Sequence, residues 1–123
     1  MYVSEAFEGA ISDRDIVEKS GFLDYIEQND VILADRGFKI HDLLMKKGAT
    51  LVIPPFTTDG ELTKEQTIMT KIIARARIHV ERYNERIKNF EILSKKIPSH
   101  LIPHISQILF VVCALVNFQE PLL

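Results

Sequence analysis

The fold is decided by the stretch VILADRGFKIHDLLMKKGATLVIPP, residues 31–55. Two short and mostly apolar runs open and close it, at residues 31–34 and 50–53. Neither run alternates apolar with polar side chains, which is typical of strands buried on both faces of a parallel or mixed sheet. Between them, residues 40–47 carry apolar side chains at helical spacing and end at Gly48, a common residue after a helix. The stretch therefore predicts a strand, a helix and a second strand that the following prolines end.

On the N-terminal side of this stretch, the pattern predicts a strand end followed by helix. Residues 2–7 are short, mixed and compatible with a strand. Residues 13–26 place apolar side chains near helical spacing, and Gly21 interrupts them, so either one helix or two shorter ones are expected.

On its C-terminal side, the chain is predicted to be helical after a loop at residues 57–60. No Gly or Pro interrupts residues 63–94, and apolar side chains recur there at spacings of three and four, which predicts one long amphipathic helix. Residues 105–118 are apolar on most sides and predict a last helix packed inside the protein. The expected fold class is α/β: a short mixed sheet with flanking helices and a long C-terminal helical region, within a single domain over residues 1–123.

Composition indicates a soluble globular domain. Of the 123 residues, 46% are hydrophobic and 26% are charged, and the net charge of −2 argues against a simple polycation. The single cysteine, Cys113, allows no internal disulfide and is expected to be a buried apolar residue in a reducing compartment. No signal peptide is expected after Met1. Residues 105–118 are shorter than the roughly 20 residues that span a bilayer, so no membrane segment is expected.

The first candidate functional residue is Asp35, which directly follows the first apolar run. Open α/β sheets bind their ligands at the carboxyl ends of strands, where neighbouring loops diverge. A carboxylate at that place can face solvent and a metal ion. The alternative is that Asp35 only starts a turn with Gly37, because both residue types are frequent in turns.

The second candidate is Glu81, within the predicted long helix. At about 100° per residue, Arg77, Glu81 and Lys88 fall within roughly 40° of one another, beside the apolar stripe. Carboxylates on a strand end and on a helix could hold Mg²⁺ or Mn²⁺ for phosphoryl transfer, and Arg77 and Lys88 could contact phosphates. The alternative for Glu81 is an ordinary ion pair with Arg77, four residues away.

Several separate phrases, in order, resemble one protein family. They are ILADRGF at residues 32–38, IPPF at 53–56, RIHVER at 77–82, and VNF at 116–118 followed by Pro121 and Leu122. Together they resemble the DDE superfamily endonucleases of the Harbinger and insertion-sequence type, over nearly the whole chain. The resemblance implies a ribonuclease-H-like fold. It also implies an endonuclease activity on DNA phosphodiester bonds, with Mg²⁺ or Mn²⁺ as cofactor.

The resemblance also implies roles for individual residues. The second catalytic Asp matches Asp35 and the catalytic Glu matches Glu81, both as metal ligands. Arg77, Glu81 and Lys88 resemble the last three members of the Tyr, Arg, Glu, Lys signature of related bacterial transposases, whereas Ala74 stands at the Tyr position. The four histidines (His41, His79, His100 and His104) are expected to be structural or surface residues.

No residue matches the first catalytic Asp of the family, which lies on the opening strand of its sheet. The chain is therefore expected to be the C-terminal portion of a single nuclease domain, without its opening strands. Asp13 and Asp15 are nearby substitutes, but a helix cap explains Asp13 adequately.

The expected partner is DNA, and a separate DNA-binding protein is expected to supply sequence-specific contacts, since phosphate contacts carry no sequence information. If the source is eukaryotic, the resemblance implies that the protein is located in the nucleus. Two alternatives stay open: a non-catalytic remnant of a transposon that serves as a DNA or protein interaction module, and an unrelated α/β interaction domain without metal chemistry.

Overall fold

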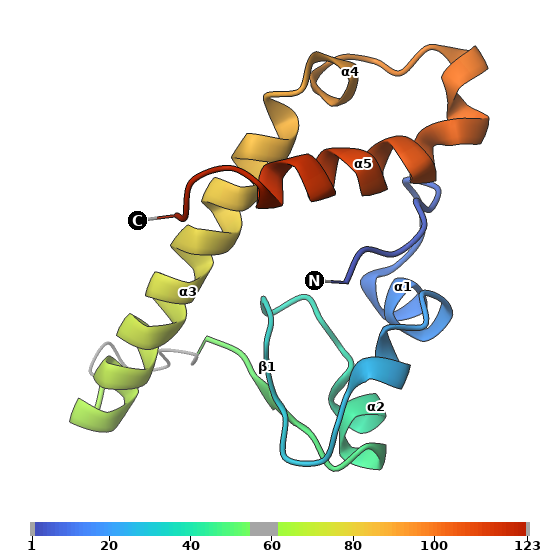
Figure 1. Cartoon of the computed structure of the whole chain (residues 1–123). Helices are drawn as coiled ribbons and strands as arrows, with labels where there is room; N and C mark the ends of the chain where they lie inside the picture. The colour runs from blue at the N-terminus through green and yellow to red at the C-terminus, as the bar shows by residue number, and fades with distance from the viewer. Residues whose placement is uncertain (1, 55–61, 123) are drawn as a thin grey trace. The chain divides into compact units, whose positions relative to one another are not determined.

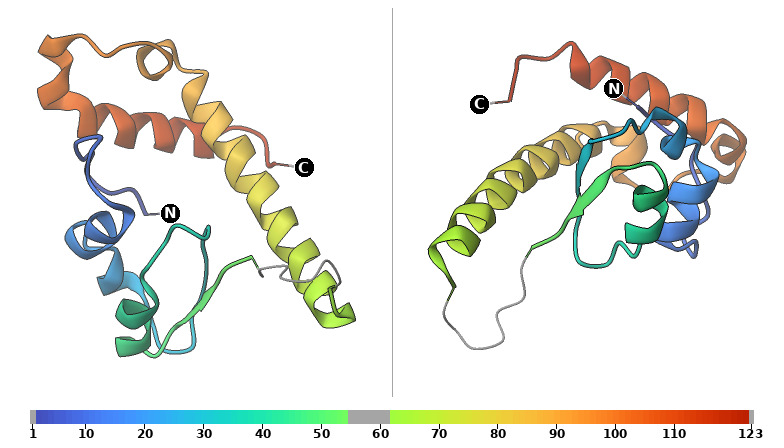
Figure 2. Two further views of the ribbon diagram at one scale, coloured as in Figure 1. Left: turned by 180° about the vertical axis from the view of Figure 1, so that it is seen from behind. Right: turned by 90° about the horizontal axis from the view of Figure 1, so that it is seen from below.

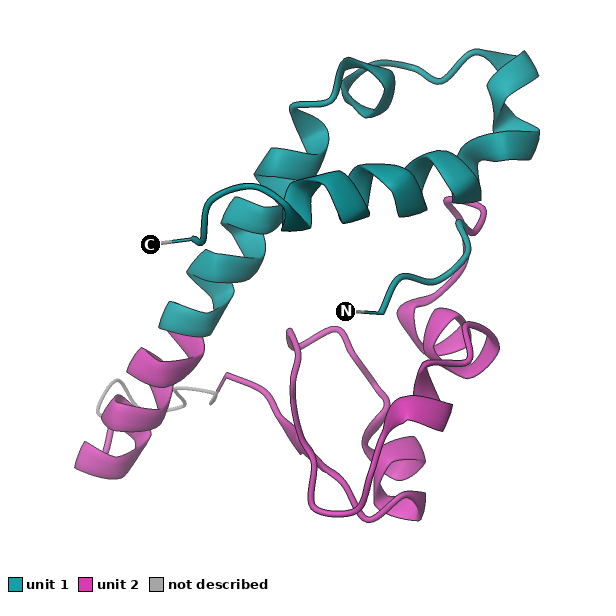
Figure 3. Ribbon diagram, viewed as in Figure 1, with its two compact units in different colours: residues 1–6, 75–123 teal, residues 7–74 magenta. Residues whose placement is uncertain are grey.

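A computed structural model describes residues 2–54 and 62–122 of the chain, so the loop expected at residues 57–60 lies outside the described residues. The fold is α/β, as predicted, with helices and a small parallel sheet. The chain forms two compact units (Figure 3). Unit 1 comprises Met1–Ala6 and Arg75–Leu123, and unit 2 comprises Phe7–Ala74.

Unit 2 contains the predicted strand, helix and strand. They are β1 (Val31–Leu33), α2 (His41–Lys46) and β2 (Thr50–Val52), of which β1 and α2 are labelled in Figure 1. Among the described residues the sheet has two strands, which pair in parallel with Ile32 opposite Leu51. The local sequence signals therefore located all three elements to within about two residues.

Glycines set two of the chain reversals in unit 2. Gly48 follows α2 with φ at +71°, and a Cβ there would lie 3.0 Å from Cγ of Gln28. Gly21, with φ at +78°, separates α1 (Asp13–Lys19) from the 3-10 helix η1 (Phe22–Tyr25). Because L side chains rarely adopt such φ values, glycine is favoured at both positions. The region expected as one helix or two is thus two helices.

The core of unit 2 lies between its helices and one face of the sheet. Ile32 and Leu51 pack against the buried cluster of Val17, Ile40, Leu43, Leu44 and Ala49. The side chains that point to the other face of β1 are exposed, Val31 at 61% and Leu33 at 46%. The prediction that this strand is buried on both faces is therefore wrong in the described structure, because α1 and α2 contribute their buried side chains to one face only.

An ion pair joins α1 to the start of α2. The Arg14 guanidinium donates to both carboxylate oxygens of Asp42, at 2.6 and 2.8 Å, and to the carbonyl of Lys39. This bidentate geometry is the strongest that an Arg–carboxylate pair adopts. The hydrogen bonds from Arg14 lower the pKa of Asp42 from 3.8 to about 2.

This pair makes the stability of unit 2 depend on pH. Because the folded-state pKa of Asp42 is depressed, its contribution is fully present above pH 3.8 and is lost as the pH falls through about 2. We expect the urea midpoint, followed by circular dichroism, to fall across this window. In Asp42→Asn the fall should be smaller. An equally steep fall in that variant would contradict the assignment.

The long helix is α3, Lys64–Lys88, which begins in unit 2 and ends in unit 1. Its start is a reciprocal cap, in which Thr63 Oγ1 accepts the Gln66 N–H and Gln66 Oε1 accepts the Thr63 N–H. The prediction that the helix continues to residue 94 is wrong. Phe90 adopts an extended backbone, ψ 119°, and a separate short helix follows, α4 (Glu91–Ser94).

Unit 1 pairs the C-terminal part of α3 with α5, Ile105–Asn117, which follows the 3-10 helix η2, Ser99–His104 (Figures 1 and 2). The Tyr83 hydroxyl on α3 lies 3.1 Å from the Cys113 carbonyl and 3.2 Å from Oδ1 of Asn117. Its single proton is donated to one of these oxygens at a time. The contact fixes the end of α5 against α3.

The last helix is buried on one face only. Val112, Cys113 and Val116 are buried, whereas Phe110 and Val111 are more than half exposed. The prediction that this helix is packed inside the protein is therefore wrong for its second face. By length and composition alone, the helical run Ser99–Asn117 could cross a membrane. This is weak evidence, since core helices of soluble proteins can meet the same criteria.

The predicted strand at residues 2–7 is also wrong. These residues form no helix or strand, and Ala6 instead donates its N–H to Oγ of Ser106 on α5 at 3.0 Å. A strand requires a neighbouring strand for its backbone hydrogen bonds, and in unit 1 the segment contacts a helix.

Candidate functional site

Asp35 follows the C-terminal end of β1 with one residue between, and it is exposed. Its Oδ1 accepts the Arg36 N–H at 2.9 Å, and its carbonyl accepts the Phe38 N–H at 3.1 Å. The turn role considered from the sequence is thus present. The exposed carboxylate of Asp35 nevertheless lies near the carboxyl end of a parallel strand, where such sheets bind their ligands.

Asp13 lies near the turn that follows Asp35, in the same unit. Its Oδ2 is 3.8 Å from the position that a Cβ on Gly37 would take. The cap of α1 is formed by Ser12, whose side chain accepts the Asp15 N–H, so Asp13 is not the capping residue. Among residues 2–54 and 62–122, however, no three His, Cys, Asp or Glu side chains form a group that could hold a metal ion.

Glu81 lies on the part of α3 that belongs to unit 1, where it pairs with Arg77. The Arg77 Nε donates to Glu81 Oε1 at 2.9 Å, and the two side chains are 58% and 62% exposed. The ion pair predicted as the alternative role of Glu81 is therefore formed. Exposed pairs of this kind contribute about 0.2–1 kcal/mol, so an incoming cation or phosphate can displace the partners at little cost.

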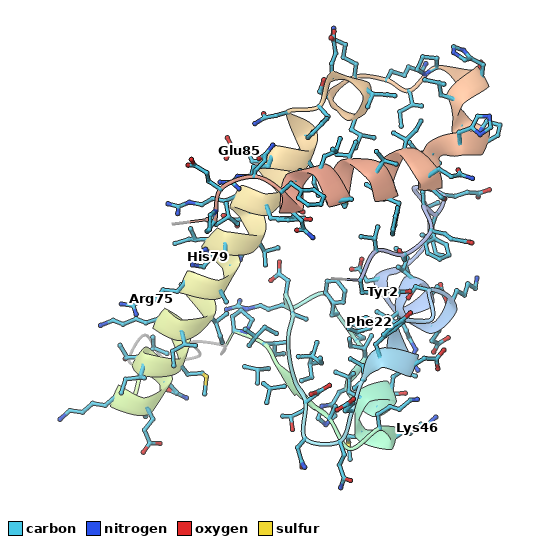
Figure 4. All side chains as sticks on the ribbon, viewed as in Figure 1. Tyr2, Phe22, Lys46, Arg75, His79 and Glu85 are labelled. Carbon is cyan, nitrogen blue, oxygen red and sulfur yellow. The ribbon has the colours of Figure 1, made fainter. Side chains whose placement is uncertain are left out.

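Glu81 and Lys88 line one shallow surface pocket of about 350 Å³, together with Asn84, Glu85 and Asn89. Glu85 is labelled in Figure 4. Glu81 and Lys88 are predicted from the sequence, whereas Asn84, Glu85 and Asn89 are not. Their spacing from Glu81, at three, four and eight residues, could have revealed them, because these intervals return to the same side of an α-helix. The pocket offers carboxylate, amide and ammonium groups on one surface.

The helix α3, which carries this pocket, contacts α5 through the hydroxyl of Tyr83 and the backbone of Cys113. Burial raises the pKa of the Tyr83 hydroxyl, and the nearby Cys113 raises it further. Burial also raises the pKa of the Cys113 thiol. Both groups are therefore neutral near pH 7, and the cysteine is the buried apolar residue that the sequence predicted.

The metal-binding residues proposed from the sequence belong to different units, Asp35 to unit 2 and Glu81 to unit 1. Their convergence on one cation stays a prediction. In chemical type they fit Mg²⁺ or Mn²⁺, since both are exposed carboxylates and hard divalent cations prefer oxygen ligands. In number they are fewer than the several oxygens that such a cation requires, so water or further groups must complete its coordination.

Comparison with known proteins adds one finding. The model of a protein family described as DDE superfamily endonuclease matches residues 1–117 of the 123. The matched span includes Asp35, Glu81 and every residue of the pocket. No curated protein and no solved structure matches the chain.

Proposed function

The chain belongs to the DDE superfamily endonucleases, and on that basis we propose that it is a transposase-derived nuclease domain that binds divalent metal and acts on DNA phosphodiester bonds. Asp35 and Glu81 are the proposed ligands of Mg²⁺ or Mn²⁺. The proposed fold is ribonuclease-H-like. A separate DNA-binding protein would supply sequence-specific contacts, and the nucleus is the proposed location for a eukaryotic source.

The observation that carries this proposal is the family match over residues 1–117. It spans both units and includes Asp35 and Glu81, which are 46 residues apart in sequence. The chemistry of the two residues agrees with it. When bound, a divalent cation supplies charge stabilisation for an in-line displacement at phosphorus.

Glu81, Arg77 and Lys88 of unit 1 would have different roles in the proposed function. Glu81 would bind the cation and release Arg77, whose planar guanidinium suits a phosphate oxygen pair. Lys88 lies on the same pocket and would act as a point charge on the DNA backbone.

A second candidate function is a non-catalytic interaction module for DNA or protein. It is favoured by one observation: the described residues contain no group of three potential metal ligands. The two functions differ in whether a divalent cation binds through Asp35 and Glu81 together.

A double-mutant cycle on Mn²⁺ affinity distinguishes them. By calorimetry, Asp35→Ala and Glu81→Ala should each weaken Mn²⁺ binding by about tenfold or more, since second-shell changes alone typically cost 10–100-fold. If both side chains hold the same cation, the double variant should lose less than the product of the single losses.

The matched control is Glu85→Ala, which removes a carboxylate from the same pocket on the same helix. Its Mn²⁺ affinity should stay within about twofold of the parent chain. Unchanged affinity in Asp35→Ala would refute the metal site and leave the interaction module as the better function.

A further inference from the structure

One side of α5 in unit 1 is apolar and exposed. At about 100° per residue, its residues fall within roughly 140° of one another around the helix. They are Phe110, Val111, Ala114, Leu115 and Phe118, and we call them the open face of α5. The four larger side chains are 48% to 88% exposed. Phe118 directly follows the helix and keeps a helical backbone conformation, so it extends the open face.

The open face is large enough for a protein interface. Its two phenylalanines, at 60% and 88% exposure, present roughly 200–350 Å² of aromatic surface. A standard interface buries about 800 Å² on each partner, of which somewhat more than half, roughly 450 Å², is apolar. With Val111 and Leu115 added, the open face supplies most of that apolar area.

The charge pattern around the open face favours a second copy of the chain as the partner. Residues 97–119 contain no Asp, Glu, Lys or Arg. In a dimer with two-fold symmetry the same patch lies on both sides of the interface, so a charge near its centre would face an identical charge. The absence of charge from this segment removes that repulsion.

The open face is also arranged symmetrically about a small residue. Phe110 and Phe118 lie four residues, or about 6 Å along the helix, on either side of Ala114. Two antiparallel copies of α5 that cross at Ala114 would therefore place Phe118 of one copy opposite Phe110 of the other. Phe110 and Val111 line a shallow hollow of about 480 Å³ in unit 1, whose other lining residues are 3–5, 106 and 107. Aromatic side chains that enter such hollows are the usual anchors of interfaces.

We propose that the open face is the interface of a homodimer, in which α5 of one protomer packs antiparallel on α5 of its partner with the two Ala114 residues at the centre. The proposal goes beyond the proposed function, because the interface requires neither Asp35 nor Glu81 and no metal ion.

A membrane surface is the weaker occupant of the open face. Helices that lie on membranes combine an apolar face with a polar face rich in Lys and Arg. α5 has no Lys or Arg, and the residues on its other side, Val112, Cys113 and Val116, are buried within the protein. The helix therefore lacks the charged face that such binding requires.

The first test is sedimentation of the 123-residue chain in EDTA, over about 1–100 µM, a range that resolves micromolar dissociation constants. The parent chain should sediment as a dimer at the upper concentrations. Phe110→Ala/Phe118→Ala should raise the Kd of the dimer by about a hundredfold or more, since truncating an aromatic anchor typically costs tenfold or more. The control Ile78→Ala/Val80→Ala removes two exposed apolar side chains from α3 of the same unit and should change Kd less than about threefold.

The second test is disulfide cross-linking, which checks the centre of the interface. Ala114→Cys should give a covalent dimer on a non-reducing gel after mild oxidation, because a disulfide forms where two Cα atoms lie within about 7 Å. Gln107→Cys lies on the same side of α5, about 10 Å from the centre, and should stay monomeric on that gel. The native Cys113 is buried and is present in both variants.

Sedimentation of the parent chain as a monomer at every concentration would overturn the proposal. So would a dimer that the phenylalanine double variant leaves intact, or equal cross-linking of the two cysteine variants. A monomeric parent chain that binds phosphatidylcholine vesicles through Phe110 and Phe118 would assign the open face to a membrane instead. All variants should keep the circular dichroism of the parent chain, since the substituted side chains are exposed or half-buried. Because neither metal nor DNA is present, the result does not depend on the Mn²⁺ experiment on Asp35 and Glu81.

Discussion

Asp35→Asn and Glu81→Gln should each reduce Mn²⁺-dependent nicking of supercoiled plasmid by about a hundredfold or more. Both changes preserve shape and a hydrogen-bond acceptor: Asn can still accept the Arg36 N–H, and Gln can still accept from Arg77. What they remove is the negative charge that would hold a divalent cation. Losing a single group that stabilises charge in a transition state typically costs 10²–10³ in rate.

The control for this prediction is Glu85→Gln, which makes the same chemical change within the pocket that contains Glu81. Its nicking rate should stay within about threefold of the parent rate. A loss as large as that of Glu81→Gln would show that the pocket, rather than the Glu81 carboxylate, determines activity. Nicking that persists in both Asp35→Asn and Glu81→Gln would rule out these residues as the metal ligands.

Elements with local signals could be predicted from the sequence. The β1, α2 and β2 segment is one, because apolar runs mark its strands and Gly48 supplies the positive φ at which its helix ends. The start of α3 is another, since Thr63 and Gln66 cap each other across three residues. In each case the residues that determine the structure are neighbours in the chain.

Features that depend on distant residues were predicted less well. The sequence marks the end of α3 only weakly. Neither residue 89 nor residue 90 is Gly or Pro, although Asn89 directly follows the helix and Asn can end one. The break appears in the extended backbone of Phe90. The prediction of which side chains are buried was wrong for the same reason. Apolar composition identified Val31 and Phe110 as interior, but both are at least 60% exposed, because burial depends on which other elements cover a face.

The same distinction between local and long-range features holds for the candidate site. The Arg77–Glu81 pair and the common side of Glu81 and Lys88 follow from helical spacing, and both are present. The approach of Asp13 to Gly37 spans 24 residues and carried no local signal. The convergence of Asp35 and Glu81 is likewise a long-range property, and the Mn²⁺ cycle and the nicking assay test it directly.

Leu44→Ala should lower the free energy of unfolding of unit 2 by about 2–5 kcal/mol, the range for truncating a buried leucine. Leu44 is fully buried, at 0% exposure, within the cluster that joins α2 to the sheet. Its carbonyl also accepts the Ala49 N–H at the start of the second strand. The free energy of unfolding of a whole domain is about 5–15 kcal/mol, so this loss removes a large share of the stability.

The matched control is the next residue, Met45→Ala, on the same helix and 63% exposed, which should change stability by about 0.5 kcal/mol or less. Native-state hydrogen exchange reports on unit 2 specifically, through the Ala34 N–H that bonds to the Val52 carbonyl. Leu44→Ala should accelerate exchange at this amide by at least thirtyfold, the factor that about 2 kcal/mol gives when exchange follows unfolding. Equal exchange rates in the two variants would mean that the cluster around Leu44 does not hold the sheet, and that the stability of β1 and β2 depends on contacts elsewhere.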